Sequence, residues 1–289
     1  MAMATTQRAR AKTTVLPDAL VVGPQRTGTT WIHRYLEHRG DVALPRHVKE
    51  TWFFTRYYSR GVPWYGSQFA RDLQHNRTIE VAPTYFHHCE VPGRIAEDLG
   101  RIPVVCTLRH PAERTLSLYL HMRRYGMTRL PFRDAAEALP ELIDSGRYGN
   151  HLERWRNRLG AENVLTLFFE DLRSDPDHWT RELCRHLSLE YRPIPAALHE
   201  RVNESRLPQH HAVAWLGQQV AVTLRSWGLY SVVEGAKRLG FKKHFFGSAG
   251  GIPVTELTSE DRRWLLGVLR PEIDHVEQML GVDLSSWKV

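Results

Sequence analysis

The chain has 289 residues, of which 42% are hydrophobic and 25% are charged, and its net charge is +7 at pH 7. These proportions are typical of a folded globular protein, and no apolar run approaches the roughly 20 residues that a membrane-spanning helix needs. The positive charge favours an anionic ligand, whereas the spread of the basic residues argues against a nucleic-acid partner. Three cysteines, Cys89, Cys106 and Cys184, lie far apart. Their number and spacing argue against a disulfide framework or zinc site and favour a reducing, cytoplasmic compartment.

The N-terminal residues 1–14 are basic and polar and lack the apolar core of a secretory signal. We expect them to form a disordered tail, and a transit peptide is the less favoured alternative. No linker or internal repeat interrupts the sequence after this tail. Residues 15–289 are therefore predicted to form one domain.

The first element after the tail combines a strand, a turn and a helix. Residues 19–22 form a short apolar run that is typical of a buried strand, and Gly23 and Pro24 end it. A helix with apolar residues at helical spacing is predicted from Thr29 onward. In such a turn the backbone N–H groups converge with the positive end of the helix dipole, which creates a phosphate-binding site.

The spacing Gly23-x-x-x-x-Gly28 is that of a P-loop. A nucleotide triphosphatase has Lys followed by Ser or Thr directly after the second glycine, where this chain has Thr29 and Thr30. The loop carries a cation at Arg26 instead. The missing lysine favours an anion with less charge than a triphosphate.

The rest of the chain alternates strands with helices. The predicted strands are residues 42–44, 77–85 with Pro83 ending the strand, 102–108 and 164–169. The predicted helices are residues 61–65, a helix that begins at Pro111, and residues 131–142, 148–159, 177–187 and 259–280. This alternation predicts an α/β fold with a P-loop-like central parallel sheet, flanked by helices, in a single domain.

Charged side chains occur close to the ends of these predicted strands. Lys49 and Glu50 lead into a run of aromatic residues and form either a surface ion pair or a functional pair. Glu80, inside a predicted strand, lies either at an exposed edge or in a site. Adjacent histidines such as His87 and His88 are more often solvated than metal-bound, and no partner stands at a metal-ligand spacing.

Arg109 follows a buried strand, and Ser117 lies about two turns into the next helix. Ligands of open α/β sheets bind outside the carboxyl ends of the strands. We therefore expect these two side chains to converge there, where they could clamp a phosphate.

Two interpretations of the loop compete. The first is a Mg²⁺-dependent P-loop nucleotide kinase or NTPase, and residues 164–171 support it because they are typical of a strand that ends in a metal-binding carboxylate. Against it, Thr29 stands where the lysine that reaches the β- and γ-phosphates belongs. A non-enzymatic module that binds sulfated glycans or nucleotides is a third possibility, but it leaves the Lys49–Glu50 pair unexplained.

The second interpretation comes from a resemblance to sulfotransferases that use 3′-phosphoadenosine-5′-phosphosulfate (PAPS). Gly23–Trp31 resembles the 5′-phosphosulfate loop of that family. Arg109–Tyr119 resembles its 3′-phosphate motif, in which arginine and serine stand eight residues apart. The blocks that are similar to the heparan sulfate N- and 3-O-sulfotransferase branch are residues 49–54, 61–65, 78–86 and 148–155, and they occur in the order of the family.

The resemblance implies in-line sulfuryl transfer from PAPS, without a metal, to a hydroxyl or amine of a carbohydrate, glycolipid or small natural product. It assigns the general base to Glu50 and catalytic cations to Lys49 and Arg26. The donor-binding residues that it implies are Gln25, Arg26, Thr27, Gly28, Thr29, Thr30, Trp31, Arg109, Ser117 and Tyr148. The residues that could contact the acceptor are Trp52, Glu80, Tyr85 and His87, and of these Glu80 and His87 are the alternative bases.

The sequence departs from that branch at several places. Val81 stands where the branch has a lysine, and the branch's C-terminal disulfide loop and Lys-Gly-Arg adenosine contact have no recognisable counterpart. Lys242, Lys243 and Gly247–Gly251 are candidates to replace that contact. Asp283–Trp287 is similar to the C-terminal pattern of the soluble bacterial members, so we expect an enzyme of that type.

Overall fold

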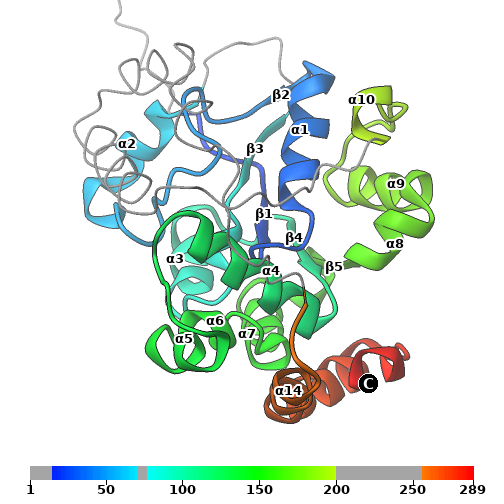
Figure 1. The fold of residues 1–289 in the computed structure, drawn as a ribbon. Coiled ribbons are helices and arrows are strands. Elements are labelled where there is room, and N and C mark those ends of the chain that lie inside the picture. The colour runs from blue at the N-terminus through cyan, green and yellow to red at the C-terminus, as the bar shows by residue number, and fades with distance from the viewer. Residues whose placement is uncertain (1–14, 70–76, 200–255) are drawn as a thin grey trace, which may run out of the picture.

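The computed structural model describes residues 15–69, 77–199 and 256–289 (Figure 1). The predicted tail at residues 1–14 and the proposed adenosine contacts at Lys242, Lys243 and Gly247–Gly251 lie outside the described residues. Within the described residues no helix is both long and apolar enough to span a membrane.

A parallel sheet forms the centre of the molecule. Its strands are β1 (Ala19–Gly23), β2 (Val42–Ala43), β3 (Arg77–Val81), β4 (Val104–Leu108) and β5 (Val164–Phe168), and their spatial order is β2-β3-β1-β4-β5. β1 pairs with β3 on one side and β4 on the other, and every strand pairing is parallel. Strands in the middle of such a sheet are covered on both faces, which explains why β1 and β4 are continuous apolar runs and buried throughout.

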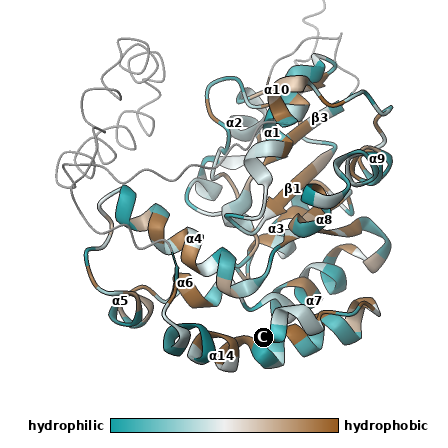
Figure 2. Cartoon of the chain, turned by 45° about the vertical axis from the view of Figure 1, so that its right-hand side comes forward, coloured by the Kyte–Doolittle hydropathy of each residue, from teal (hydrophilic) through white to brown (hydrophobic). Residues whose placement is uncertain are grey.

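Helices cover both faces of this sheet. α1 (Thr29–Arg39), α8 (Phe169–Ser174), α9 (Pro176–His186) and α10 (Ala196–His199) lie on one face, and α3 (Val91–Asp98), α4 (Pro111–Arg124), α7 (Tyr148–Leu159) and α14 (Ser259–Leu280) lie on the other (Figure 1). Alternate residues of β1 face opposite ways, so Ala19 and Val21 pack against α1 and α9, and Leu20 and Val22 join the core beneath α4 and α7. Figure 2 shows brown, hydrophobic strands in the centre and helices that carry both teal and brown stretches.

Two predicted elements differ from the structure. The helix predicted at residues 131–142 is two short helices, α5 (Phe132–Ala138) and α6 (Glu141–Asp144). The break falls at Leu139, because the ring of Pro140 disfavours a helical conformation in the residue before it. The strand predicted at residues 77–85 ends at Val81, and Pro83–Tyr85 form a 3₁₀ turn.

The C-terminal helix α14 is confirmed at both ends. Thr258 caps it by accepting a hydrogen bond from the Asp261 N–H, and Gly281 ends it in the left-handed conformation. The following 3₁₀ turn, Ser285–Lys288, buries Trp287 against Tyr148. The end of the chain thus closes the core beside the carboxyl end of β4.

The remaining short elements connect the sheet to the site. A 3₁₀ turn (Tyr58–Arg60) and α2 (Gly61–Ser67) lie between β2 and β3, and a 3₁₀ turn (Ala161–Asn163) precedes β5. The segment 46–57, which lacks regular helix or strand, carries Lys49 and Glu50. Because β1 lies between β3 and β4, the segments that follow these three strands meet at one edge of the sheet.

Candidate active site

The loop of residues 24–28 between β1 and α1, hereafter the phosphate loop, is tightly wound. Gly23 and Gly28 have φ values of +91° and +94°, and Arg26 has a φ of +73°. A Cβ atom on Gly28 would lie 2.9 Å from Cδ2 of Phe169, so this position needs glycine for its space as well as its conformation. The loop delivers the chain into α1, whose first N–H groups have no intrahelical partner and can bind an anion.

The side chains of Thr27 and Trp31 serve the loop and the core instead of facing this site. Thr27 is fully buried, and its Oγ1 donates to the Pro24 carbonyl at 2.6 Å and lies 2.6 Å from Oγ1 of Thr107. Trp31 donates its indole N–H to the Leu198 carbonyl at 3.1 Å. The predicted donor-binding roles of Thr27 and Trp31 stay predictions, and the backbone N–H of Trp31 donates to the Gly28 carbonyl at 2.8 Å.

Lys49 lies directly beside the start of α1. Its Nζ donates to Oγ1 of Thr29 and to Oγ1 of Thr30, each at 3.3 Å. Burial lowers the pKa of Lys49 to about 8, the nearby charge of Arg26 lowers it further, and Glu50 opposes this shift. The resemblance assigned Lys49 as a second cation beside Arg26 of the loop, and the structure places Lys49 against Thr29 and Thr30.

Glu50 is held by the turn that follows β3. One carboxylate oxygen, Oε1, accepts the Thr84 N–H at 3.0 Å and also the Thr84 hydroxyl. Burial raises the pKa of Glu50 to about 7; the charge of Glu80 adds to the rise, and the hydrogen bonds from Thr84 and the charge of Lys49 oppose it. A carboxylate with a pKa near neutrality can take up a proton in turnover at physiological pH.

Arg26, Arg109 and Ser117 meet on the other side of the loop. The Arg26 Nε donates to Ser117 Oγ at 2.9 Å, and Nη1 of Arg109 donates to the Arg26 carbonyl at 3.4 Å. Burial lowers the pKa of Arg26, and the charge of Arg109 lowers it further. Two partly buried guanidinium groups that destabilise each other's charge form a site that an anion would stabilise. The predicted convergence of Arg109 and Ser117 beside the loop is confirmed.

Tyr148 lies behind this cluster. It is fully buried, and its hydroxyl donates to the Arg109 carbonyl at 2.9 Å. Burial raises the pKa of Tyr148 to about 12, so the phenol remains a neutral donor. The predicted contact of Tyr148 with the donor stays a prediction; in this structure its hydroxyl fixes the backbone of Arg109.

Glu80 and Tyr85 belong to the core below the site. Both are fully buried, and the Glu80 carboxylate accepts hydrogen bonds from the Thr51 N–H at 2.6 Å and the Tyr65 hydroxyl at 2.7 Å. Because β3 is an interior strand, the alternative of an exposed edge for Glu80 is wrong. Both side chains are enclosed in this structure, which gives no support to Glu80 as a base or to Tyr85 as an acceptor contact, and these two roles stay predictions.

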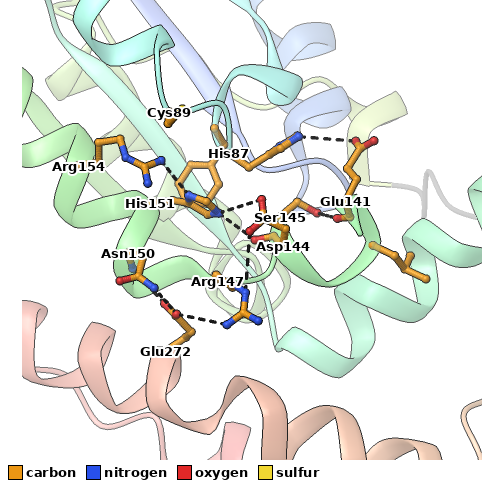
Figure 3. A network of polar contacts seen from close by, with 12 residues as sticks. His87, Cys89, Glu141, Asp144, Ser145, Arg147, Asn150, His151, Arg154 and Glu272 are labelled. Carbon is orange, nitrogen blue, oxygen red and sulfur yellow. Dashed lines mark hydrogen bonds and ion pairs between the residues drawn. The ribbon is translucent and has the colours of Figure 1, made fainter. Parts of the chain in front are cut away.

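His87 and Trp52 are the other two predicted acceptor contacts. The imidazole of His87 is 9% exposed, its Nε2 lies 3.9 Å from Oε1 of Glu141, and burial lowers its pKa to about 3 (Figure 3). The same Glu141 oxygen accepts from Nε2 of Gln25 at 3.3 Å, so His87 and the phosphate loop share one carboxylate. Trp52 is half-buried beneath the guanidinium of Arg56. The roles of His87 and Trp52 stay predictions.

Sequence reasoning missed two residues of this arrangement, Thr84 and Glu141. Thr84 holds the Glu50 carboxylate with two donors, and the signal for it was its place directly after Pro83 at the end of β3. Glu141 lay near the end of the single helix predicted at residues 131–142, and it begins α6 in the structure. Among the described residues, no group of three or more His, Cys, Asp or Glu side chains is placed to hold a metal ion.

The fold and this site define an α/β protein with a P-loop-like turn that is suited to binding an anion. Residues 16–208 match the family model of the sulfotransferase domain. The chain therefore belongs to the sulfotransferase family, and the predicted family and fold class are confirmed. Family membership replaces the alternative of a nucleotide kinase or NTPase, and the carboxylate of Glu170, which that alternative used, accepts the His110 N–H at 2.9 Å.

Sequence relatives of this chain include the bifunctional heparan sulfate N-deacetylase/N-sulfotransferase of Drosophila melanogaster. It is 30% identical over 207 residues, which are 61% of this chain and 20% of that protein. The mouse bifunctional heparan sulfate N-deacetylase/N-sulfotransferase 2 is 32% identical over 182 residues, or 56% of this chain and 21% of that one. The chain thus spans about a fifth of the length of these curated relatives.

A crystal structure of a sulfotransferase from Alicyclobacillus acidocaldarius has a similar fold. It matches with a TM-score of 0.67 and 18% sequence identity, over 95% of this chain and 100% of that chain. This likeness supports the shared fold and, at that identity, says nothing about the acceptor.

Proposed function

We propose that this chain transfers the sulfuryl group of PAPS to an amine or hydroxyl of a carbohydrate and releases 3′-phosphoadenosine-5′-phosphate (PAP). The observation that carries this proposal is the Lys49–Glu50 pair beside the phosphate loop, a cation and a carboxylate whose pKa values both lie near neutrality. The names of the curated relatives support an amino sugar as acceptor. A glycolipid and a small natural product are the other acceptor classes to be tested.

The donor fits the two anion sites around the loop. We assign the 5′-phosphosulfate to the loop N–H groups and the hydroxyls of Thr29 and Thr30, at the positive end of α1. We assign the 3′-phosphate to Arg109 and Ser117. Arg26 lies between the two groups, bonded to Ser117. A nucleotide with a 3′-phosphate would therefore bind more tightly than one without it.

In the proposed transfer step, Glu50 takes the proton of the acceptor O–H or N–H while the acceptor atom forms a bond to sulfur. The bond between sulfur and the 5′-phosphate oxygen breaks, and its electron pair stays on that oxygen. Lys49 and Arg26 donate hydrogen bonds to the charge that grows there. Arginine does not give up its proton, so Arg26 can contribute charge and hydrogen bonds only.

Thr84 contributes to this step by keeping Glu50 in place. Its two hydrogen bonds stabilise the ionised carboxylate and leave the second oxygen, Oε2, for the acceptor proton. On the other side of the phosphate loop, Gln25 donates a hydrogen bond to Glu141, which ties the loop to α6. His87, kept neutral by burial, lies on that side and is an alternative base.

Calorimetry and turnover test the proposal together. PAP should bind without Mg²⁺, and adenosine 5′-phosphate, which lacks the 3′-phosphate, should bind at least about 10-fold more weakly. Labelled PAPS should then be offered with N-desulfated heparan chains, a glycolipid and small phenols. Glu50→Gln should keep PAP affinity and lose at least about 100-fold in turnover. Absence of PAP binding would refute the proposed donor, and full turnover by the variant would move the base to His87.

We further propose that the enzyme works in a reducing cytoplasmic compartment, as a soluble enzyme of the bacterial type. The three cysteines support this, because Cys106 and Cys184 are buried as free thiols and Cys89 is exposed and also free. Detection of the chain in a cytosolic fraction, with all three thiols alkylatable after denaturation, is the expected result.

A further inference from the structure

Glu80 is a fully buried glutamate in β3, the second strand from the edge of the sheet. It lies in register with Leu20 of β1, and its side chain is 0% exposed. A buried carboxylate is costly unless hydrogen bonds satisfy it. The three groups that donate to it are all neutral: the Thr51 N–H at 2.6 Å, the Tyr65 hydroxyl at 2.7 Å and the Tyr85 hydroxyl at 3.3 Å.

The first of these donors, Thr51, immediately follows Glu50, and the residues after it contact Tyr85. The Thr51 N–H binds Glu80 directly, and the Phe54 N–H donates to the Tyr85 hydroxyl at 3.3 Å. Thr51 Oγ1 accepts the Phe53 N–H at 3.2 Å and lies 3.3 Å from the same Tyr85 hydroxyl. Between them, Trp52 adopts a left-handed φ of +54°. Residues 51–54 thus obtain from Glu80 and its partners the hydrogen bonds that a helix or strand would otherwise supply.

Glu80, which binds the Thr51 N–H, and Thr84, which binds Glu50, belong to the same stretch of chain. Glu80 is the fourth residue of β3, and Thr84 lies four residues later in the turn after it. The stretch 80–84 therefore holds the backbone next to Glu50 through Thr51 and the carboxylate of Glu50 through Thr84. A shift of Thr51 would move Glu50 and Lys49 relative to the phosphate loop.

We propose that Glu80 is a positioning residue for sulfuryl transfer, which ties the Lys49–Glu50 segment to the sheet so that both side chains face the phosphate loop. This inference rests on the proposed function. According to it, Glu80 affects turnover but contacts neither the donor nor the acceptor. The nearest charged and titratable groups agree with an indirect role: Glu80 faces Tyr65 and Tyr85, and Glu50 faces Lys49 and Glu80.

Two substitutions separate the hydrogen bond that Glu80 accepts from Thr51 from the negative charge of its carboxylate. Glu80→Gln keeps an oxygen that can accept the Thr51 N–H, and Glu80→Met keeps the length of the side chain and removes that acceptor. We expect Glu80→Met to lower kcat about 10- to 100-fold with PAP affinity unchanged, and Glu80→Gln to restore kcat to within about 5-fold of the native chain. The charge of Glu80 raises the pKa of Glu50, and burial raises the pKa of Glu80 itself, so the acid limb of the Glu80→Gln variant is recorded beside kcat.

A control is Glu272, a second buried glutamate that accepts a backbone N–H. It is 6% exposed and accepts the Asn150 N–H at 3.0 Å, between α14 and α7 (Figure 3). Glu272→Gln should change the unfolding temperature and leave the pH profile in place. This control separates the loss of a buried hydrogen bond from a change in the Lys49–Glu50 segment.

The outcomes distinguish this inference from the proposed function. If the native chain transfers sulfate and Glu80→Met turns over as fast as Glu80→Gln, the positioning role is overturned and the proposed function stands. If the native chain transfers no sulfate to any acceptor, the proposed function itself fails. Should Glu80→Met lose PAP binding through misfolding, Glu80→Asp decides, because it keeps the carboxylate and withdraws the acceptor from the Thr51 N–H: a fall in kcat at unchanged PAP affinity supports the role, and a native kcat overturns it.

Discussion

The pH dependence of turnover tests the Lys49–Glu50 pair most directly. Burial raises the pKa of Glu50 to about 7 and lowers that of Lys49 to about 8. Glu50 must be ionised to accept a proton, and Lys49 must be protonated to offset negative charge. Because kcat/KM for PAPS reports the ionisations of the free enzyme, it should fall on both sides of a maximum near about pH 7.5.

The size of the effect follows from the two pKa values. With them, about 60% of the free enzyme has both groups in the required state at about pH 7.5, and about 3% at about pH 5.5, which is a loss of roughly 20-fold. A glutamate with its ordinary pKa of 4.5 would still be about 90% ionised at the lower pH. The pH at which the rate falls on the acid side therefore shows whether Glu50 has the raised pKa of a buried carboxylate or the ordinary pKa of a surface one.

The assay is the initial rate with labelled PAPS, at constant ionic strength. The affinity for PAP is measured by calorimetry at each pH, because the second ionisation of a phosphate monoester lies near about 6 and affects donor binding. Lys49→Arg is the matched variant: arginine does not titrate in this range, so the alkaline limb should vanish and the acid limb should stay. A rate that is constant from about pH 5.5 to 7.5 at unchanged PAP affinity would refute the assignment of Glu50 as the base.

Three further predictions concern the residues around this pair. Glu50→Gln should stabilise the chain by about 1–3 kcal/mol at pH 8 and have no effect at pH 4, as measured by thermal unfolding, because a carboxyl whose pKa is raised from 4.5 to about 7 on folding costs stability as the pH rises from the unfolded to the folded pKa. Ser117→Ala should weaken PAP binding by about 10-fold in calorimetry and leave adenosine 5′-phosphate binding unchanged; equal losses for both would place the 3′-phosphate elsewhere. Gly28→Ala should destabilise the chain more than Gly40→Ala, because both glycines have positive φ but only Gly28 meets a neighbour, Phe169, within 3 Å.

The part of the fold that could be predicted from the sequence is the part with a local physical cause. An apolar run such as β1 is buried on both faces wherever it lies, and Gly28 allows the turn before α1 without reference to distant residues. Thr258 and Gly281 fix the ends of α14 in the same local way. The break at Pro140 was equally local, and the sequence already contained the residue that causes it.

The orientation of polar side chains could not be predicted in this way. The partners of Glu80 are Thr51 and Tyr65, which lie 29 and 15 residues away, so nothing near Glu80 shows whether it faces solvent, a site or the core. The same holds for Tyr148, whose hydroxyl binds a carbonyl 39 residues away. A family pattern shows that such residues matter, but only the packing shows whether they touch the ligand or hold the residues that touch it.

The order of the strands explains why the site needs residues from four separate segments. β1 supplies the phosphate loop, and its neighbours β3 and β4 supply Thr84 on one side and Arg109 on the other. The Lys49–Glu50 segment belongs to none of these strands and has no sheet hydrogen bonds of its own. Its position therefore depends on hydrogen bonds from side chains. The buried carboxylate of Glu80 supplies one of them by accepting the Thr51 N–H. Transfer chemistry that depends on Glu50 thus depends on a second glutamate that the acceptor never reaches.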